Sequence, residues 1–390
     1  MALSVNGLSS VGNLMVSVSV ARGESLSRLG QYALAFSIYV LVVGLVRTAV
    51  TESVLAARTG PAPKTIADGA RRACAIAVVT GVAAAGAGVV VGSSYLTIAG
   101  LALPGLALYD YAKAISIGVG GTRVAVVQEC VWTACTAVAV GAAFVTAVPP
   151  VMIFAGWAGS GALTGYVVAL WQRHGALPGW GLDRRDTRVA ATFAAQFLVT
   201  TGSAQLALSG LAATAGVAVV GALGAARTVF GPVTLLMTTL SSLIVPYLAQ
   251  MRPDTPRARV RIAGTVVALA VGLMFPLVIA VCLLPDEVGR AVLGENWHAA
   301  QPLLPLLSIE ALLAPVALVA FAGHRVQSAS GRALAIGVGL GPLRVAVIVA
   351  GGVLFGAGGA AGALAALALL SAACWWFSYL SLGSEKGSLR

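Results

Sequence analysis

Residues 225–261, AARTVFGPVTLLMTTLSSLIVPYLAQMRPDTPRARVR, decide the fold class of the chain. The stretch places one cation, Arg227, deep inside a long apolar run, where a charge in a membrane is costly. Gly231-Pro232 interrupts the helix that this run predicts, because proline lacks an N–H and its ring clashes with the preceding turn. Four arginines follow between positions 252 and 261, and so basic a loop does not cross a bilayer easily. A charged, interrupted helix with such an anchor is typical of a membrane transport pathway.

The composition of the 390 residues excludes a soluble globular protein, since 59% are hydrophobic, 9% are charged and the mean hydropathy is +0.95. The net charge of +11 does not predict nucleic-acid binding, because the cations fall in short loops and match membrane topology and anionic head groups. The five cysteines contain no CxxC pair, so we expect neither a metal site nor a disulfide framework. The sequence also lacks the motifs of nucleotide-binding, zinc-protease and serine-hydrolase sites, and it predicts neither an enzyme nor a cofactor.

Twelve apolar runs are long enough to span a membrane, which takes about 20 residues. They are 2–20, 29–50, 72–92, 95–117, 124–147, 150–171, 189–211, 215–249, 262–284, 302–323, 333–355 and 358–380, the eighth being long enough to include a kinked or interfacial lead-in. With the N-terminus inside, 19 of the 24 Lys and Arg residues fall on the cytoplasmic side. Only Arg22, Arg28 and Arg290 fall outside, and Arg227 and Arg344 lie within the membrane. This asymmetry predicts a multi-pass protein with both termini in the cytoplasm.

The chain also repeats itself at about half its length. Leu29-Gly30 and its surroundings resemble Val220-Gly221, 191 residues on, and Leu103-Pro104 resembles Leu304-Pro305. Such internal repeats are common in transporters, where they give two structurally related halves. Both halves would start and end inside, so an axis along the membrane normal would relate them.

The predicted domain organisation follows from this repeat. We expect an N-terminal six-helix lobe at 1–175, a basic cytoplasmic linker at 176–188 and a C-terminal six-helix lobe at 189–390. The fold class is therefore all-α integral membrane, with about 12 transmembrane helices in two pseudo-symmetric six-helix bundles.

Several short motifs carry a family resemblance. They are Gly12-Asn13, Leu29-Gly30-Gln31-Tyr32-Ala33, Gly44-Leu45-Val46-Arg47, Leu103-Pro104 to Asp110, Ala226-Arg227, Gly231-Pro232 and Leu293-Gly294-Glu295-Asn296-Trp297. With them, the chain resembles the polysaccharide flippase branch of the multidrug/oligosaccharidyl-lipid/polysaccharide exporter superfamily over nearly its whole length. This resemblance implies two bundles in a V around a central cavity, working by alternating access. It also implies lipid-linked sugars as substrates, carried as undecaprenyl-(pyro)phosphate conjugates or related glycolipids.

The function implied is a flippase in a bacterial plasma membrane, moving a lipid-linked oligosaccharide or related glycolipid for cell-surface polysaccharide biosynthesis. Its expected partners are the lipid-linked glycan, membrane lipids, and the glycosyltransferases and polymerase of the same pathway, but no nucleic acid. One alternative is a cation-coupled multidrug exporter of the same superfamily, disfavoured because the first and seventh predicted helices contain no acidic residue. Another is an integral-membrane glycan polymerase or scaffold.

Three charged residues within the membrane are the first site candidates. Arg227, expected near mid-depth, is either a structural cation or, as we favour, a phosphate contact in the cavity. Glu310 and Arg344 lie on successive antiparallel helices at similar depths. We expect them to pair and join the two helices, the alternative being a role with a coupling ion or the substrate.

A second set of candidates lies toward the cytoplasmic ends of the helices. Asp110 and Lys113 are three residues apart on one helical face and are predicted to form a gate or interfacial pair. Glu129 is expected to be interfacial, and Arg47 to extend to the cytoplasmic surface.

Three amides complete the list of candidates. Asn13, Gln196 and Gln205 could line the cavity and bind sugar, although hydrogen bonding between helices is the favoured role for each.

Overall fold

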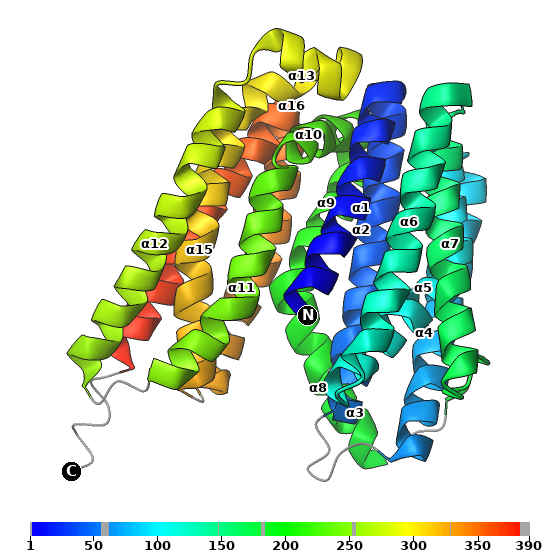
Figure 1. Cartoon of the computed structure of the whole chain (residues 1–390). Coiled ribbons are helices and arrows are strands. Elements are labelled where there is room, and N and C mark those ends of the chain that lie inside the picture. The colour runs from blue at the N-terminus through cyan, green and yellow to red at the C-terminus, as the bar shows by residue number, and fades with distance from the viewer. Residues whose placement is uncertain are drawn as a thin grey trace.

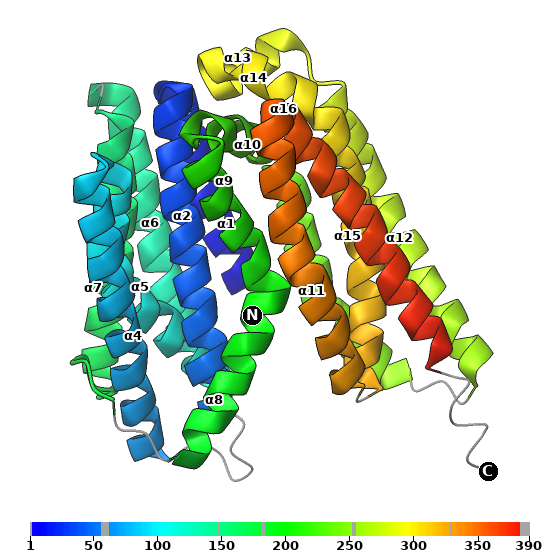
Figure 2. The same ribbon diagram turned by 180° about the vertical axis from the view of Figure 1, so that it is seen from behind.

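Every regular element is a helix in the part of the chain that the structure, a computed structural model, describes: residues 2–55, 62–146, 148–180, 184–251, 255–327 and 329–382. Figures 1 and 2 show two bundles that meet at one end, near α10 (Val217–Val229) and α13 (Asp286–Leu293). They diverge toward the other end, where α3 (Glu52–Leu55) and the end of α16 (Ser330–Ser381) lie. The predicted all-α architecture in two bundles is confirmed.

The N-terminal half supplies the first bundle. Its helices are α1 (Ala2–Gly23), α2 (Leu26–Val46), α4 (Pro63–Val90), α5 (Ser94–Gly118), α6 (Thr122–Thr146) and α7 (Pro150–Trp171). A π-helical turn, η1 (Arg47–Thr51), joins α2 to α3. Serine and proline residues start the helices that follow the short connections. The Ser93 hydroxyl accepts a hydrogen bond from the Leu96 N–H at the start of α5, and Pro150 occupies the first position of α7, where no N–H is needed.

The rest of the chain begins with α8 (Arg184–Phe197), which continues through η2 (Leu198–Gly202) into α9 (Ser203–Thr214). The helices after α10 are α11 (Gly231–Met251), α12 (Pro256–Cys282), α14 (Trp297–Ala300), α15 (Leu304–Val326) and α16 (Ser330–Ser381), with short 3-10 turns on either side of α14. Figure 2 shows α8 and α9 running between the bundles. α8 packs against η1, and α9 contacts both α2 and α16.

A bend between α10 and α11 and a break within α16 relate the observed helices to the predicted spans. α10 and α11 meet at 70°, just before Gly231-Pro232, so the eighth predicted span is a bent pair with α10 as its lead-in. α16 is interrupted at Phe355 and Gly356, where Gly356 has φ +63°, a conformation that glycine adopts readily. Its two halves are the eleventh and twelfth spans. Among the described residues, seven helices are long and apolar enough to cross a membrane, or eight if the bent pair is one span.

The end where the bundles meet is held by close backbone packing between α2 and α10. A Cβ added to Gly30 would overlap the Val217 carbonyl oxygen, and one added to Gly221 would overlap that of Leu26. Each added Cβ would also lie 3.1 Å from the other glycine's nitrogen. Small residues allow helices to approach this closely in lipid. Gly30 and Gly221 are equivalent positions of the sequence repeat, so the contact lies where an axis relating the two halves would pass.

A buried amide adds a second link at the same end. The Asn296 Nδ2 donates hydrogen bonds to the carbonyl oxygens of Ala21, at 2.7 Å, and Glu24, at 2.8 Å. These bonds join the connection between α13 and α14 to the end of α1, and thus one half of the chain to the other. Because Asn296 is only 5% exposed, its bonds are protected from competition with water.

Candidate functional site

A cavity of about 230 Å³ collects the three membrane-embedded charges that the sequence singled out. Its walls come from α9, α10, α15 and α16, all in the second half of the chain. Arg227 lies in the last turn of α10, Glu310 lies about two turns into α15, and Arg344 lies in the first half of α16. The remaining lining is mostly Leu, Ala and Ile, with Ser371 as a further polar group.

The ion pair within this cavity differs from the predicted one. The Arg227 Nη2 lies 3.5 Å from the Glu310 Oε1, whereas the Glu310–Arg344 pair is not among the ion pairs of the described residues. Arg344 lines the same cavity, within electrostatic range of both groups. Arg227 can reach Glu310 because it lies in the last turn of α10, which contacts α15.

Arg344 lies near the middle of the first half of α16, and α10, which carries Arg227, lies near the end where the bundles meet (Figure 1). The expected mid-depth position of Arg227 stays a prediction. Glu310 is about 9 Å from the start of α15, at 1.5 Å per residue. The side chains of Arg227 and Glu310 are 37% and 32% exposed, so the pair is open to a ligand. The site therefore has two cations and one anion in a cavity within the second half of the chain.

The second set of charges lies within the N-terminal half, with partners other than those predicted. Lys113 pairs with Glu129 at 3.1 Å, and Asp110 pairs with Arg47 at 3.6 Å, so Asp110 and Lys113 do not pair with each other. Glu129 is fully buried rather than interfacial, and its Oε2 also accepts a hydrogen bond from the Tyr109 hydroxyl at 2.9 Å. The Arg47 side chain is 49% exposed and contacts the otherwise buried Asp110.

The charged residues around Glu129 form a structural network rather than an open binding site. A paired, hydrogen-bonded carboxylate can be buried without the penalty of an isolated charge. Tyr109 in turn packs edge-on against Trp132 at 4.5 Å between ring centroids, and the Trp132 Nε1 donates to the Trp157 carbonyl oxygen at 2.8 Å. Sequence reasoning missed Tyr109 and Trp157, because nothing in an apolar run indicates which aromatic faces a buried acid.

The three amides are not among the residues that line the charged cavity. The Ser37 hydroxyl donates to the Gln205 Oε1 at 2.7 Å, which links α2 to α9 across the two halves. Asn13 is half-buried in α1, and its Oδ1 has no hydrogen-bond partner among the described residues. Gln196 is half-buried on α8.

Comparisons with known proteins show the fold and a partial match to one family. A model of the family described as "Polysaccharide biosynthesis protein" matches residues 132–302. No curated protein sequence shows significant similarity. The chain is similar to an inward-facing multidrug resistance MATE family transporter of the MOP superfamily, with TM-score 0.70, 14% identity and coverage of 96% of this chain and 95% of that one. An outward-facing transporter of the same description gives TM-score 0.62, with 12% identity over 100% and 94% of the chains.

A lipid II flippase, MurJ, in an inward closed conformation is equally similar, with TM-score 0.69, 8% identity and coverage of 97% of this chain and 87% of that one. All three likenesses extend over almost the full length of both chains, so the whole arrangement of helices is shared. The chain therefore shares the fold of these solved transporters, and the match of residues 132–302 to the polysaccharide biosynthesis family bears out the resemblance stated from the sequence.

Proposed function

We propose that the chain moves a lipid-linked oligosaccharide or a related glycolipid from the inner to the outer leaflet of the plasma membrane, by alternating access. The observation that carries this proposal is the cavity with Arg227, Arg344 and Glu310. Two guanidiniums against one carboxylate give a net positive site with apolar walls. Guanidinium stays charged at any physiological pH and donates in a planar fork that fits phosphate oxygens.

The position of the cavity supports the same substrate class. A lipid-linked sugar has a phosphate or diphosphate, which needs cations, and a long apolar tail, which is most stable in lipid. The proposed access is from the side on which the bundles diverge (Figure 1), with the head group in the cavity and the tail in lipid. The greater likeness to an inward-facing than to an outward-facing transporter, TM-scores 0.70 and 0.62, agrees with this direction of access.

The experiment is a flipping assay with purified protein in liposomes. We expect polyprenyl-diphosphate-linked sugars to be translocated faster than in protein-free liposomes, and an Arg344→Gln variant to lose most of the rate. Arg290→Gln is the matched control, because Arg290 is exposed on α13 and is not among the residues that line the cavity. Transport of cationic dyes, with no translocation of any lipid-linked sugar, would support a multidrug exporter instead.

The proposal includes an orientation, with both termini and the diverging ends of the bundles in the cytoplasm. The described cations support it. Lys64, Arg71, Arg72, Arg123, Arg257, Arg259, Arg261, Arg325 and Arg332 all lie near helix ends on the diverging side, while Arg22, Arg28 and Arg290 lie on the other. An excess of cations marks the cytoplasmic side. Arg58, Arg252, Lys386 and Arg390 lie outside the described residues.

Cysteine labelling tests this orientation, in a variant whose five native cysteines are replaced by alanine. Cysteines at Ser94 and Glu295, both exposed at the end where the bundles meet, should react with an impermeant thiol reagent added to whole cells. Cysteines at Ala62 and Gly331, exposed at the diverging end, should react only after the cells are opened. The reverse pattern would invert the orientation and, with it, the proposed direction of access.

A further inference from the structure

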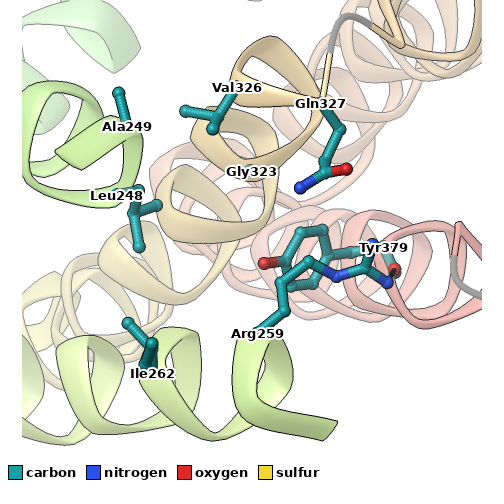
Figure 3. Close-up of a pocket in the computed structure, with 8 residues that line it drawn as sticks. All are labelled: Leu248, Ala249, Arg259, Ile262, Gly323, Val326, Gln327 and Tyr379. Carbon is teal, nitrogen blue, oxygen red and sulfur yellow. Dashed lines mark hydrogen bonds between the residues drawn. The ribbon is translucent and has the colours of Figure 1, made fainter. Parts of the chain in front are cut away.

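A second and larger cavity, of about 340 Å³, lies nearer the diverging end of the C-terminal half than the charged site does. Its walls come from the end of α11, the start of α12, the end of α15 and the end of α16 (Figure 3). Arg259 is the fourth residue of α12, Gln327 directly follows α15, and Tyr379 is two residues before the end of α16. All three therefore lie at the diverging end of the bundle, far along the helices from Arg227.

Arg259 is an unusual cation for this position, because it is only 8% exposed. Its guanidinium lies over the Tyr379 ring, 5.2 Å from the centroid, and its Nη2 donates to the Tyr379 carbonyl oxygen at 3.5 Å. Its Nε is buried and has no hydrogen-bond partner, and no ion pair to Arg259 is found, in the described part of the chain. A buried guanidinium whose partners are one aromatic ring and one backbone carbonyl is poorly compensated, so an anion in the cavity would stabilise it.

The surroundings supply further positive charge and a neutral donor. Arg325 lies over the Phe321 ring at the end of α15, and the Arg332 Nη1 donates to the Ser381 hydroxyl at 3.1 Å. Figure 3 shows the Gln327 side chain pointing toward the guanidinium from the end of α15. None of the eight residues that line the cavity is acidic. Asp254 and Glu385, the acids closest in sequence, lie outside the described residues.

We propose that this cavity binds a phosphate ester. The unpartnered Nε and the Nη groups of Arg259 present the planar set of donors that phosphate oxygens accept. The Gln327 amide can add a neutral hydrogen bond, while Leu248, Ile262 and Val326 give the apolar contact that a glycerol or acyl segment needs. The shared chemistry has two sources: the head group of an anionic phospholipid in the adjacent leaflet, or a soluble phosphate ester. The site is separate from the proposed transport cavity and does not depend on the transported substrate.

Bound phosphate would tie α12 to α15 and α16 at the diverging end of the C-terminal bundle. The test is therefore the effect of phosphate on thermal unfolding of the full-length protein. One arm uses nanodiscs of phosphatidylcholine with or without phosphatidylglycerol. The other uses phosphatidylcholine nanodiscs with added glycerol 3-phosphate at constant ionic strength. We expect a concentration-dependent rise in the unfolding temperature in one of the two arms, and that arm identifies the source.

Arg259→Gln should lower the apparent affinity at least tenfold. The matched control is Arg261→Gln, which removes an exposed cation two residues away and should leave the affinity within twofold. If Arg259→Gln does not fold, Gln327→Leu is the second variant, with a smaller loss expected because it removes a neutral donor.

Stabilisation that is equal in wild type, Arg259→Gln and Gln327→Leu, or absent from both arms, would overturn the proposal. A carboxylate of the chain is the competing partner for Arg259. If Asp254→Asn or Glu385→Gln destabilised the protein as much as Arg259→Gln while phosphate had no effect, that carboxylate would occupy the site.

Discussion

Replacing Gly221 by leucine should reduce transport more than tenfold while leaving both bundles folded. The reason is steric, because even a Cβ at Gly221 overlaps the Leu26 carbonyl oxygen, and that backbone atom cannot move aside like a side chain. α2 and α10 must then separate, which opens the end where the bundles meet. Alternating access requires this end to close and open in each cycle, so a protein that cannot close it cannot complete the cycle.

The measurements are the flipping rate per inserted molecule and the labelling of a cysteine at Val217, on the α10 side of the contact. Labelling from outside should increase in Gly221→Leu. Gly264→Leu in α12 is the matched control, because a Cβ there meets no atom within 4 Å. A Gly221→Leu variant with normal transport would show that the α2–α10 contact is not part of the cycle. A variant that fails to accumulate would show that the contact is needed for folding.

The same pair of glycines shows how much of the fold the sequence could predict. Leu29-Gly30 and Val220-Gly221 were matched only by their common offset, and in the structure the two glycines contact each other. Span positions and the break at Gly231-Pro232 were also predictable, because hydropathy and proline act locally along the chain. These features require no knowledge of how one helix is rotated against the next.

The pairing of charges does require that knowledge, and there the predictions were wrong. Glu129 stands only two turns into α6, which suggested an interfacial position, yet its face of the helix is turned toward α5, where Lys113 and Tyr109 bury it. Membrane helices are apolar on nearly all faces, so their sequence does not specify which face is inside. Arg259 was predicted to be a loop cation for the same reason. α12 begins at Pro256, and the ends of α15 and α16 then cover the arginine.

The largest effect on transport with the least effect on folding is expected at Arg227. Its pair with Glu310 is about one-third exposed, and ion pairs of that kind contribute only about 0–1 kcal/mol to stability. Losing the pair should therefore leave the protein inserted and folded. Losing the charged hydrogen bonds to a phosphate should remove about 1.5–3 kcal/mol of the free energy of interaction with the substrate. This corresponds to about a 10- to 100-fold loss of transport. Arg227→Gln should show that loss, and Arg227→Lys, which keeps the charge without the fork, should retain partial activity.

Glu310→Gln separates a substrate contact from a structural pair. If Arg227 binds phosphate, neutralising its partner leaves Arg227 and Arg344 with no carboxylate beside them in the cavity. Substrate should then bind more tightly but be released more slowly, so the concentration for half-maximal flipping and the maximal rate should both fall. If Arg227 serves only to join α10 to α15, Arg227→Gln and Glu310→Gln should lower protein abundance equally, and their double mutant should be no worse than either. A normal flipping rate per inserted Arg227→Gln molecule, with Arg290→Gln as the reference, would remove Arg227 from the mechanism.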